Sequence, residues 1–193
     1  LTNKKFSNQS FQPRVDVSFN SSDSLLVISD NGIGMNKDDL KENLGTIARS
    51  GTKNFLNKLS GDVKKDSNLI GQFGVGFYSC FMVADSVEVL TRKAGEKTAF
   101  LWKSDGKTGF TMKESSRDSQ GTTITLNINE EGKEFLSRWQ IENIIKKYSD
   151  HISFPIFLEF EETIPSDSEG KEEATEVKVE QINSASAFWK KNK

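Results

Sequence analysis

The chain has 193 residues, with 26 basic and 28 acidic side chains, a formal net charge of −2 and 34% hydrophobic residues. This length fits one domain, or one domain with the edge of a second, and the balanced charge argues against nucleic-acid binding. One cysteine excludes an internal disulfide and a multi-cysteine zinc site, and one histidine leaves little room for a hydrolytic triad. No apolar run approaches the roughly 20 residues of a membrane helix.

Short strands and a helix are predicted in the first quarter of the chain. Residues 14–19 alternate between polar and apolar, and residues 25–29 form a continuous apolar run, so both predict strands joined by a turn at 21–24. Residues 36–44 predict a helix, with Asn36 as its N-cap and acidic residues in the first turn.

The middle of the chain adds helices and more strands. A short helix is predicted at 53–59, and an apolar helix at 77–84 contains Cys80, which is predicted to be an inert core thiol. Four further strands are predicted at 86–91, 98–102, 108–112 and 122–128. Their close spacing, with glycine-containing turns between them, favours an antiparallel meander.

The last part changes in composition. Apolar residues at three- and four-residue intervals predict a helix over 133–149, and 152–160 predicts a strand in which Pro155 favours an edge position. An acidic stretch follows from 161, and residues 175–180 alternate weakly, as a strand would. The whole order predicts an α+β fold, a two-layer sandwich whose mostly antiparallel sheet is covered on one face by helices.

The first candidate motif is DNGIGM at 30–35, directly after a predicted buried strand. Asp30 at a strand end could place its carboxylate at the mouth of a pocket, where it can accept a hydrogen bond from an exocyclic amine such as that of adenine. The glycines allow another molecule to approach the backbone closely. Asp-Asn-Gly is also a common hairpin turn, and alone this motif favours that simpler interpretation.

The second motif is GQFGVG at 71–76, which leads into the apolar segment. Glycines expose backbone N–H groups, and a helix N-terminus adds partial positive charge, so the two together suit a phosphate. The spacing is neither the dinucleotide fingerprint nor a P-loop. A flexible turn between elements is the alternative.

Two further motifs are weaker. Residues 44–52 hold two glycines, small side chains and the cation Arg49, as a hinged lid over a phosphate would, or as an exposed connector would. Gly121-Thr122-Thr123 could offer a hydroxyl to a ligand or a water, although in isolation β-branched residues that simply fill a strand are the better explanation.

In this order, DNGIGM, LGTIARSGTK, GQFGVGFYS and GTTITL closely resemble one family, the ninety-kilodalton heat-shock chaperones, in their N-terminal ATP-binding domain. The resemblance runs from about RVDVSF to the last strand, and KYSDHISFPI also matches. LGTIARSGT and GQFGVGFYS are highly specific to this family. Type II topoisomerase ATPase domains, MutL-type repair proteins and sensor histidine kinases share only looser DxGxG and GxxGxG patterns.

The resemblance implies a site for the nucleotide base. Asp30 would read the adenine amino group, with Gly34 and Thr122 as water-linked helpers. Met35 and Phe77 would form apolar walls of the pocket.

The resemblance also implies a phosphate site. Asn43 would lie near the ribose and phosphates, and Arg49 stands where the family usually has lysine, so its charge is kept but its contact geometry can differ. The phosphate-wrapping loop would comprise Gly71, Gln72, Phe73, Gly74, Val75 and Gly76. The implied cofactor is ATP or ADP, with Mg²⁺ in the complete domain.

The chain begins at Leu1, after the point where the family has its first strand and first long helix. In the family that helix carries the general-base Glu and the magnesium-binding Asn, so no catalytic residue or metal ligand is assigned here. The full-length protein is expected to be a slow ATPase, and this fragment to be inactive.

The resemblance predicts an ATP-binding domain over 1–160, a short acidic connector over 161–174 and the start of a middle domain over 175–193. The acidic connector is short, unlike the long charged linkers of cytosolic eukaryotic members, which points to a bacterial or organellar member with bacterial favoured. A cytoplasmic location is expected. The full-length protein would be a homodimeric stress-response chaperone that uses ATP to fold client proteins, with no nucleic-acid or membrane partner.

Two alternatives stay open. An ATPase module of a DNA topoisomerase or mismatch-repair relative would predict a basic neighbouring surface and a different lid. A non-enzymatic α+β interaction domain would use the glycine motifs only as turns, and nucleotide titration would separate it from the other two hypotheses.

Overall fold

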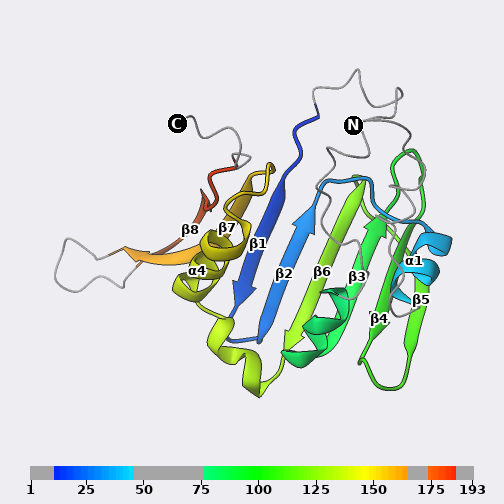
Figure 1. Cartoon of the computed structure of the whole chain (residues 1–193), viewed down its shortest axis with the longest axis horizontal. Helices are drawn as coiled ribbons and strands as arrows, with labels where there is room; N and C mark the ends of the chain where they lie inside the picture. Colours follow the sequence, from blue (N-terminus) through cyan, green and yellow to red (C-terminus); the bar gives the residue numbers. More distant parts are fainter. Residues whose placement is uncertain (1–10, 46–75, 165–173, 186–193) are drawn as a thin grey trace.

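The computed structural model describes residues 11–45, 76–164 and 174–185, and the described strands form one mixed sheet (Figure 1). The predicted helix at 53–59, the candidate lid from residue 46 onward and residues 71–75 of the glycine-rich loop lie outside the described residues.

Eight strands form the sheet, in the order β5-β4-β3-β6-β2-β1-β7-β8. Their bounds are β1 Val15–Asn20, β2 Leu25–Asp30, β3 Ala84–Arg92, β4 Ala99–Ser104, β5 Phe110–Ser115, β6 Gly121–Ile128, β7 Ile156–Ile164 and β8 Ala174–Gln181. Every neighbouring pair is antiparallel except β1 with β7, which is parallel. The predicted α+β class with a mostly antiparallel sheet is therefore confirmed.

The predicted meander is correct for three strands only. β3, β4 and β5 are consecutive antiparallel neighbours, but β6 returns between β3 and β2 instead of pairing with β5. Burial explains this order. β6 has four buried residues and needs neighbours on both sides, whereas β5 is exposed at four of its six positions and suits an edge.

The edge position predicted for 152–160 is wrong, because β7 lies between β1 and β8. Pro155 precedes the first residue of β7, so its missing N–H removes no bond from the ladder, and its carbonyl accepts from Val15 N–H at 3.0 Å. The strand predicted at 175–180 is confirmed as β8, which pairs with β7 and is itself the edge strand on that side of the sheet. The assignment of 175–193 to a second domain stays a prediction.

Helix α1, Lys37–Leu44, begins as predicted. The Asn36 side chain accepts from Asp39 N–H and the Asp39 side chain accepts from Asn36 N–H, each at 3.0 Å, which forms a reciprocal capping box. Leu40 and Leu44 form the buried face of the helix.

Two other helical predictions need correction. The segment predicted at 77–84 is a 3₁₀-helix, η1 Gly76–Met82, and β3 already begins at Ala84. The helix predicted over 133–149 is two elements, the 3₁₀-helix η2 Glu130–Phe135 and helix α4 Arg138–Ser149. The break falls at Leu136, whose ψ of 54° is not helical, and Ser137 then caps α4 through Gln140 N–H.

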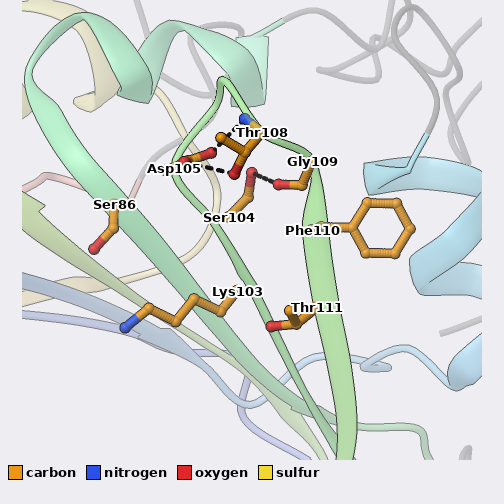
Figure 2. Close-up of a pocket in the computed structure, with 8 residues that line it drawn as sticks. All are labelled: Ser86, Lys103, Ser104, Asp105, Thr108, Gly109, Phe110 and Thr111. Atoms are coloured by element: carbon orange, nitrogen blue, oxygen red, sulfur yellow. Dashed lines mark hydrogen bonds between the residues drawn. The ribbon is translucent and has the colours of Figure 1, made fainter.

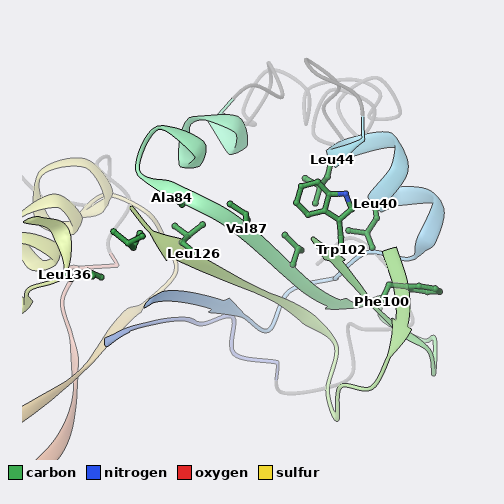
Figure 3. Packing of buried hydrophobic residues seen from close by; sticks show 10 residues of the cluster. Leu40, Leu44, Ala84, Val87, Phe100, Trp102, Leu126 and Leu136 are labelled. Atoms are coloured by element: carbon green, nitrogen blue, oxygen red, sulfur yellow. The ribbon is translucent and has the colours of Figure 1, made fainter. Parts of the chain in front are cut away.

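The helices lie on one face of the sheet, as Figures 1 and 3 show. One apolar cluster packs under α1 and η1, where the fully buried Trp102 stacks on Phe110 at 5.8 Å and meets the edge of Phe77 at 5.6 Å between ring centroids. A second cluster joins Ile141 and Ile145 of α4 to β1 and β7. Both apolar clusters lie between the helices and this face of the sheet, so a ligand site between helices and sheet is expected on the same face.

Candidate nucleotide site

Three polar side chains lie in a row at one end of the sheet. Asp30 ends β2 and is the cross-strand partner of Thr122 on β6, which in turn is the partner of Thr91 on β3. Each shares its strand face with residues of the packed core, such as Ile28 beside Asp30 and Val89 beside Thr91. The row therefore faces the helix side of the sheet.

Asp30 is half-buried, and among the described residues only one of its carboxylate oxygens accepts a hydrogen bond. Oδ1 accepts from Gly32 N–H at 2.7 Å. Within the described residues the second oxygen makes no hydrogen bond, so it can accept one from a ligand or a water. The strand that Asp30 ends is partly buried rather than buried as the sequence predicts, and the role of Asp30 as an acceptor for a ligand stays a prediction.

The loop after Asp30 rests directly on the backbone of two other strands. Gly34 has φ +65°, and a Cβ there would lie 2.0 Å from the carbonyl oxygen of Arg92. Gly121 has φ +120°, and its Cβ would lie 2.1 Å from the carbonyl oxygen of Asp30. Only glycine fits either position. In this structure Gly34 thus fixes the loop that follows Asp30, and its predicted role as a helper at the base stays untested.

Thr91 connects this loop to the sheet, and the sequence analysis did not identify it. Its hydroxyl accepts from Met35 N–H at 2.9 Å, lies 3.0 Å from the Thr122 hydroxyl and donates to the Gly121 carbonyl at 3.1 Å. The residue is fully buried. One signal could have revealed it, because Thr91 is a polar residue in the buried register of β3, two positions after Val89.

Arg117, in the loop between β5 and β6, is a second residue that the sequence analysis missed. Its guanidinium donates to the Asp30 carbonyl at 3.1 Å and also to the carbonyls of Ser119 and Gln120. These bonds tie the loop to the end of β2. No sequence pattern marks Arg117, because an arginine in a polar loop is ordinarily a solvated side chain.

The other predicted residues are only partly brought together. Met35 and Phe77 are partly buried and pack against the same apolar cluster, so both border one region of the core. Asn43 is partly exposed on α1 and Gly76 is exposed at the start of η1. Their contact with a ribose or a phosphate stays a prediction. The remaining predicted residues, Arg49 and those at 71–75, lie outside the described residues.

A separate hollow of about 280 Å³ lies at the β4–β5 hairpin (Figure 2). It contains no predicted site residue, and strand register places it at the end of β4 away from Asp30. Asp105 there accepts from the N–H groups of Lys107 and Thr108 and from the Thr108 hydroxyl, and these bonds lower its pKa to about 2. The polar groups of this turn bond one another, so the hollow follows from the shape of the hairpin.

Reactive and metal-binding groups are sparse in the part of the chain that the structure describes. No three His, Cys, Asp or Glu side chains there are grouped to hold a metal ion. Burial raises the pKa of the Cys80 thiol to about 11, so it stays protonated at neutral pH, as an inert thiol would. None of the described helices is long and apolar enough to cross a membrane.

Comparison with known proteins identifies the class to which this fold and site belong. The family model of histidine kinase-, DNA gyrase B- and HSP90-like ATPases matches residues 7–105, and the chain belongs to this family. Membership of an ATPase family implies that the domain binds a nucleotide.

Its relatives narrow the class further. The chain is 55% identical to the chaperone protein HtpG of Helicobacter hepaticus, over 98% of this chain and 31% of the relative. It is 53% identical to HtpG of Wolinella succinogenes and 49% identical to HtpG of Borreliella afzelii, in both cases over 100% of this chain. The predicted resemblance to the heat-shock chaperones is confirmed. The chain spans about a third of the length of these relatives.

Proposed function

We propose that this chain is the ATP-binding part of an ATP-dependent chaperone that assists protein folding. The observation that carries the proposal is the row formed by Asp30, Thr122 and Thr91, in which a carboxylate that has one oxygen without a hydrogen bond among the described residues lies beside a buried hydroxyl. Membership of the ATPase family and the chaperone names of its relatives support the same function.

Asp30 recognises the adenine base. Its unoccupied oxygen accepts a hydrogen bond from the exocyclic amine, and guanine is disfavoured because it presents a carbonyl at the same position. Met35 and Phe77, which pack on one apolar cluster, supply surfaces for the flat faces of the base.

Asn43, Arg49 and the loop 71–76 contact the ribose and phosphates. Mg²⁺ would accompany ATP, but the described residues hold no group of three metal ligands, so they do not fit a complete metal site and no step is assigned to the ion. Attack on the γ-phosphate also needs a group that orients water. None of the described residues is assigned that role, because Asp30 serves the base and Asp39 is engaged by the α1 cap and by Lys93 at 2.7 Å.

The whole protein is proposed to be a cytoplasmic homodimer that binds client proteins in a cycle driven by ATP. Clients, dimer contacts and turnover belong to this proposal, because the chain spans only about a third of the relatives it matches.

Calorimetric titration of the chain with ADP and with GDP tests the proposed site. We expect ADP to bind at least about tenfold more tightly, since one nucleotide presents a donor to Asp30 and the other leaves two acceptors facing each other. The same titration of Asp30→Asn should show that the preference for ADP is lost. Asp85→Asn is the matched control for that variant, because this exposed acid on β3 makes no hydrogen bond or ion pair among the described residues. Equal affinity for the two nucleotides, or no binding at millimolar ADP, would contradict the proposal.

A further inference from the structure

Asn31 and Gly32 form an Asn-Gly pair directly after Asp30, and Asn31 is the only asparagine of the chain that is followed by glycine. Asn-Gly is the pair most open to spontaneous deamidation, because glycine has no side chain to hinder the reaction. The Gly32 nitrogen loses its proton and attacks the Asn31 Cγ, ammonia leaves, and a cyclic imide forms. Water then opens the imide to aspartate or isoaspartate.

The structure favours glycine at position 32 in spite of this chemistry. A Cβ on Gly32 would lie 2.8 Å from Asp30 Oδ1, so the carboxylate would have to move. It would then lose the hydrogen bond that it accepts from Gly32 N–H. The reactive pair is therefore part of the turn that ends β2, and its protection has to come from its hydrogen bonds.

The attacking nitrogen is held by a charged acceptor. Gly32 N–H donates to Asp30 Oδ1 at 2.7 Å, so the proton that must leave is bound to a carboxylate. A carboxylate is a far weaker base than an amide anion, so it does not remove this proton. Its negative charge also opposes the anion that has to form at the nitrogen.

The Asn31 side chain is held by the segment that precedes β1. Its Oδ1 accepts from Arg14 N–H at 2.9 Å, and its Nδ2 donates to the Gln12 carbonyl at 2.8 Å. Ring closure expels Nδ2, so the bond to Gln12 is lost. A carboxylate formed in its place would face the Gln12 carbonyl as a second acceptor.

We propose that Asn31 is a latent deamidation site, which Asp30 and residues 12–14 protect in the folded chain and which reacts when this turn opens. Asp30 thereby has a second role as the residue that positions Gly32 N–H away from reaction. Nucleotide binding does not enter this protection, since the bond to Gly32 uses Asp30 Oδ1 alone. The modification would mark chains that have been unfolded.

The experiment follows the deamidated fraction of the peptide that contains Asn31 by mass spectrometry, during incubation in mildly alkaline buffer. The parent chain is compared with itself in guanidinium chloride, and with Asp30→Ala and Asp30→Asn. We expect the folded parent to react at least about tenfold more slowly than the denatured parent, and Asp30→Ala to react about tenfold faster than the folded parent, the worth of one hydrogen bond to a charged acceptor. Asp30→Asn keeps an oxygen that can accept from Gly32 N–H and should stay closer to the parent.

Asn20 is the internal reference, because it is followed by serine and its side chain bonds to Asp23 instead. Unfolding accelerates both asparagines, whereas loss of the local bond accelerates Asn31 alone. Equal rates in the folded and denatured parent, or a folded Asp30→Ala with the parent's rate, would overturn the inference. If Asp30→Ala does not fold, amide-proton exchange at Gly32 in the parent decides by NMR. Slow exchange is expected, and exchange as fast as in the denatured chain would overturn the protection.

Discussion

Two regions of the sheet are held together by different chemistry, the β7–β8 edge with α4 and the Asp30 end of the central strands β2, β6 and β3. Around α4, β7 and β8 most side-chain contacts are partly exposed ion pairs, beside one buried amide, Asn183, which accepts from Ile156 N–H. Arg138 pairs with Glu142 at 2.6 Å and Glu180 at 2.9 Å, and Lys178 pairs with Glu162. Around Asp30 most contacts are made by threonine hydroxyls and backbone groups, with the Asp30 carboxylate and the Arg117 guanidinium as the charged members, and the hydroxyl of Thr91 is fully buried.

The difference shows where the molecule tolerates change. An ion pair in water contributes little, because solvent and salt screen it and long side chains lose entropy when held. The α4 region therefore depends on its apolar cluster, which includes Ile141 and Leu158. At the Asp30 end the hydroxyl of Thr91 bonds three particular groups, so the loss of this hydroxyl leaves buried partners unsatisfied. A site that must distinguish two similar bases is expected at the second kind of region.

The largest effect is expected where the loop after Asp30 meets the sheet. Gly34→Ala places a Cβ 2.0 Å from the Arg92 carbonyl at φ +65°, so the loop or β3 must move. We expect a loss of about 3–5 kcal/mol in the free energy of unfolding, measured by urea denaturation.

Gly95→Ala is its matched control, because Gly95 has φ +83° but no atom within 4 Å of the added Cβ. This variant should lose only about 1–2 kcal/mol, the intrinsic penalty of a left-handed backbone for alanine. Similar losses in the two variants would show that backbone conformation, rather than the close contact at Gly34, sets the tolerance of the Asp30 end.

The second effect concerns binding. Asp30→Asn removes the carboxylate charge and can aim an amide N–H at the ligand amine. We expect ADP affinity to fall at least about tenfold, which corresponds to about 1–3 kcal/mol for a mismatched buried group. Calorimetry measures it, with far-ultraviolet circular dichroism to confirm folding. A folded variant that binds ADP like the parent would remove Asp30 from the site.

The contrast between the two regions also explains how much could be predicted from the sequence. Local patterns predicted the strands and the Asn36 cap, because alternation and capping depend on neighbours in the chain. They did not predict that β6 pairs with β2 and β3, or that β8 pairs with β7 in the same sheet, because strand order depends on burial across the whole sheet.

For the candidate site, Asp30 was predictable from its place at the end of an apolar strand followed by glycines. The hydrogen bonds of Thr91 were not predictable, because each of its three partners lies 30 or more residues from it in the chain. Arg117 was equally hidden, since its partner at Asp30 is 87 residues away.

A third and smaller effect is expected at Arg117. Arg117→Gln removes the guanidinium that ties the β5–β6 loop to the Asp30 carbonyl. We expect ADP affinity to fall about threefold, the partial loss of one hydrogen bond that acts through position rather than contact. Calorimetry with Lys113→Gln, an exposed cation on β5, provides the comparison. A loss as large as that of Asp30→Asn would mean that Arg117 itself contacts the ligand.

The smallest effect is expected in the charged region and depends on pH. The hydrogen bond from Arg138 lowers the pKa of Glu142, and Lys146 adds to this. A carboxyl whose pKa is lower in the folded state stabilises the fold above its unfolded pKa, and this contribution is lost as the pH falls through the folded pKa. Glu142→Gln should therefore be slightly less stable than the parent at pH 7, and the difference should shrink as the pH falls below the ordinary pKa range of a glutamate.

Thermal unfolding of both proteins between pH 7 and pH 3 measures this difference, and 0.5 M salt should reduce it at pH 7 because the pairs are partly exposed. Glu134→Gln, an exposed acid of η2 without an ion pair among the described residues, should show no such dependence. A pH-dependent loss for Glu142→Gln that matches the loss of Gly34→Ala would contradict the contrast between the two regions. The charged network would then hold the fold as firmly as the buried one does, and the greater tolerance expected around α4 would not exist.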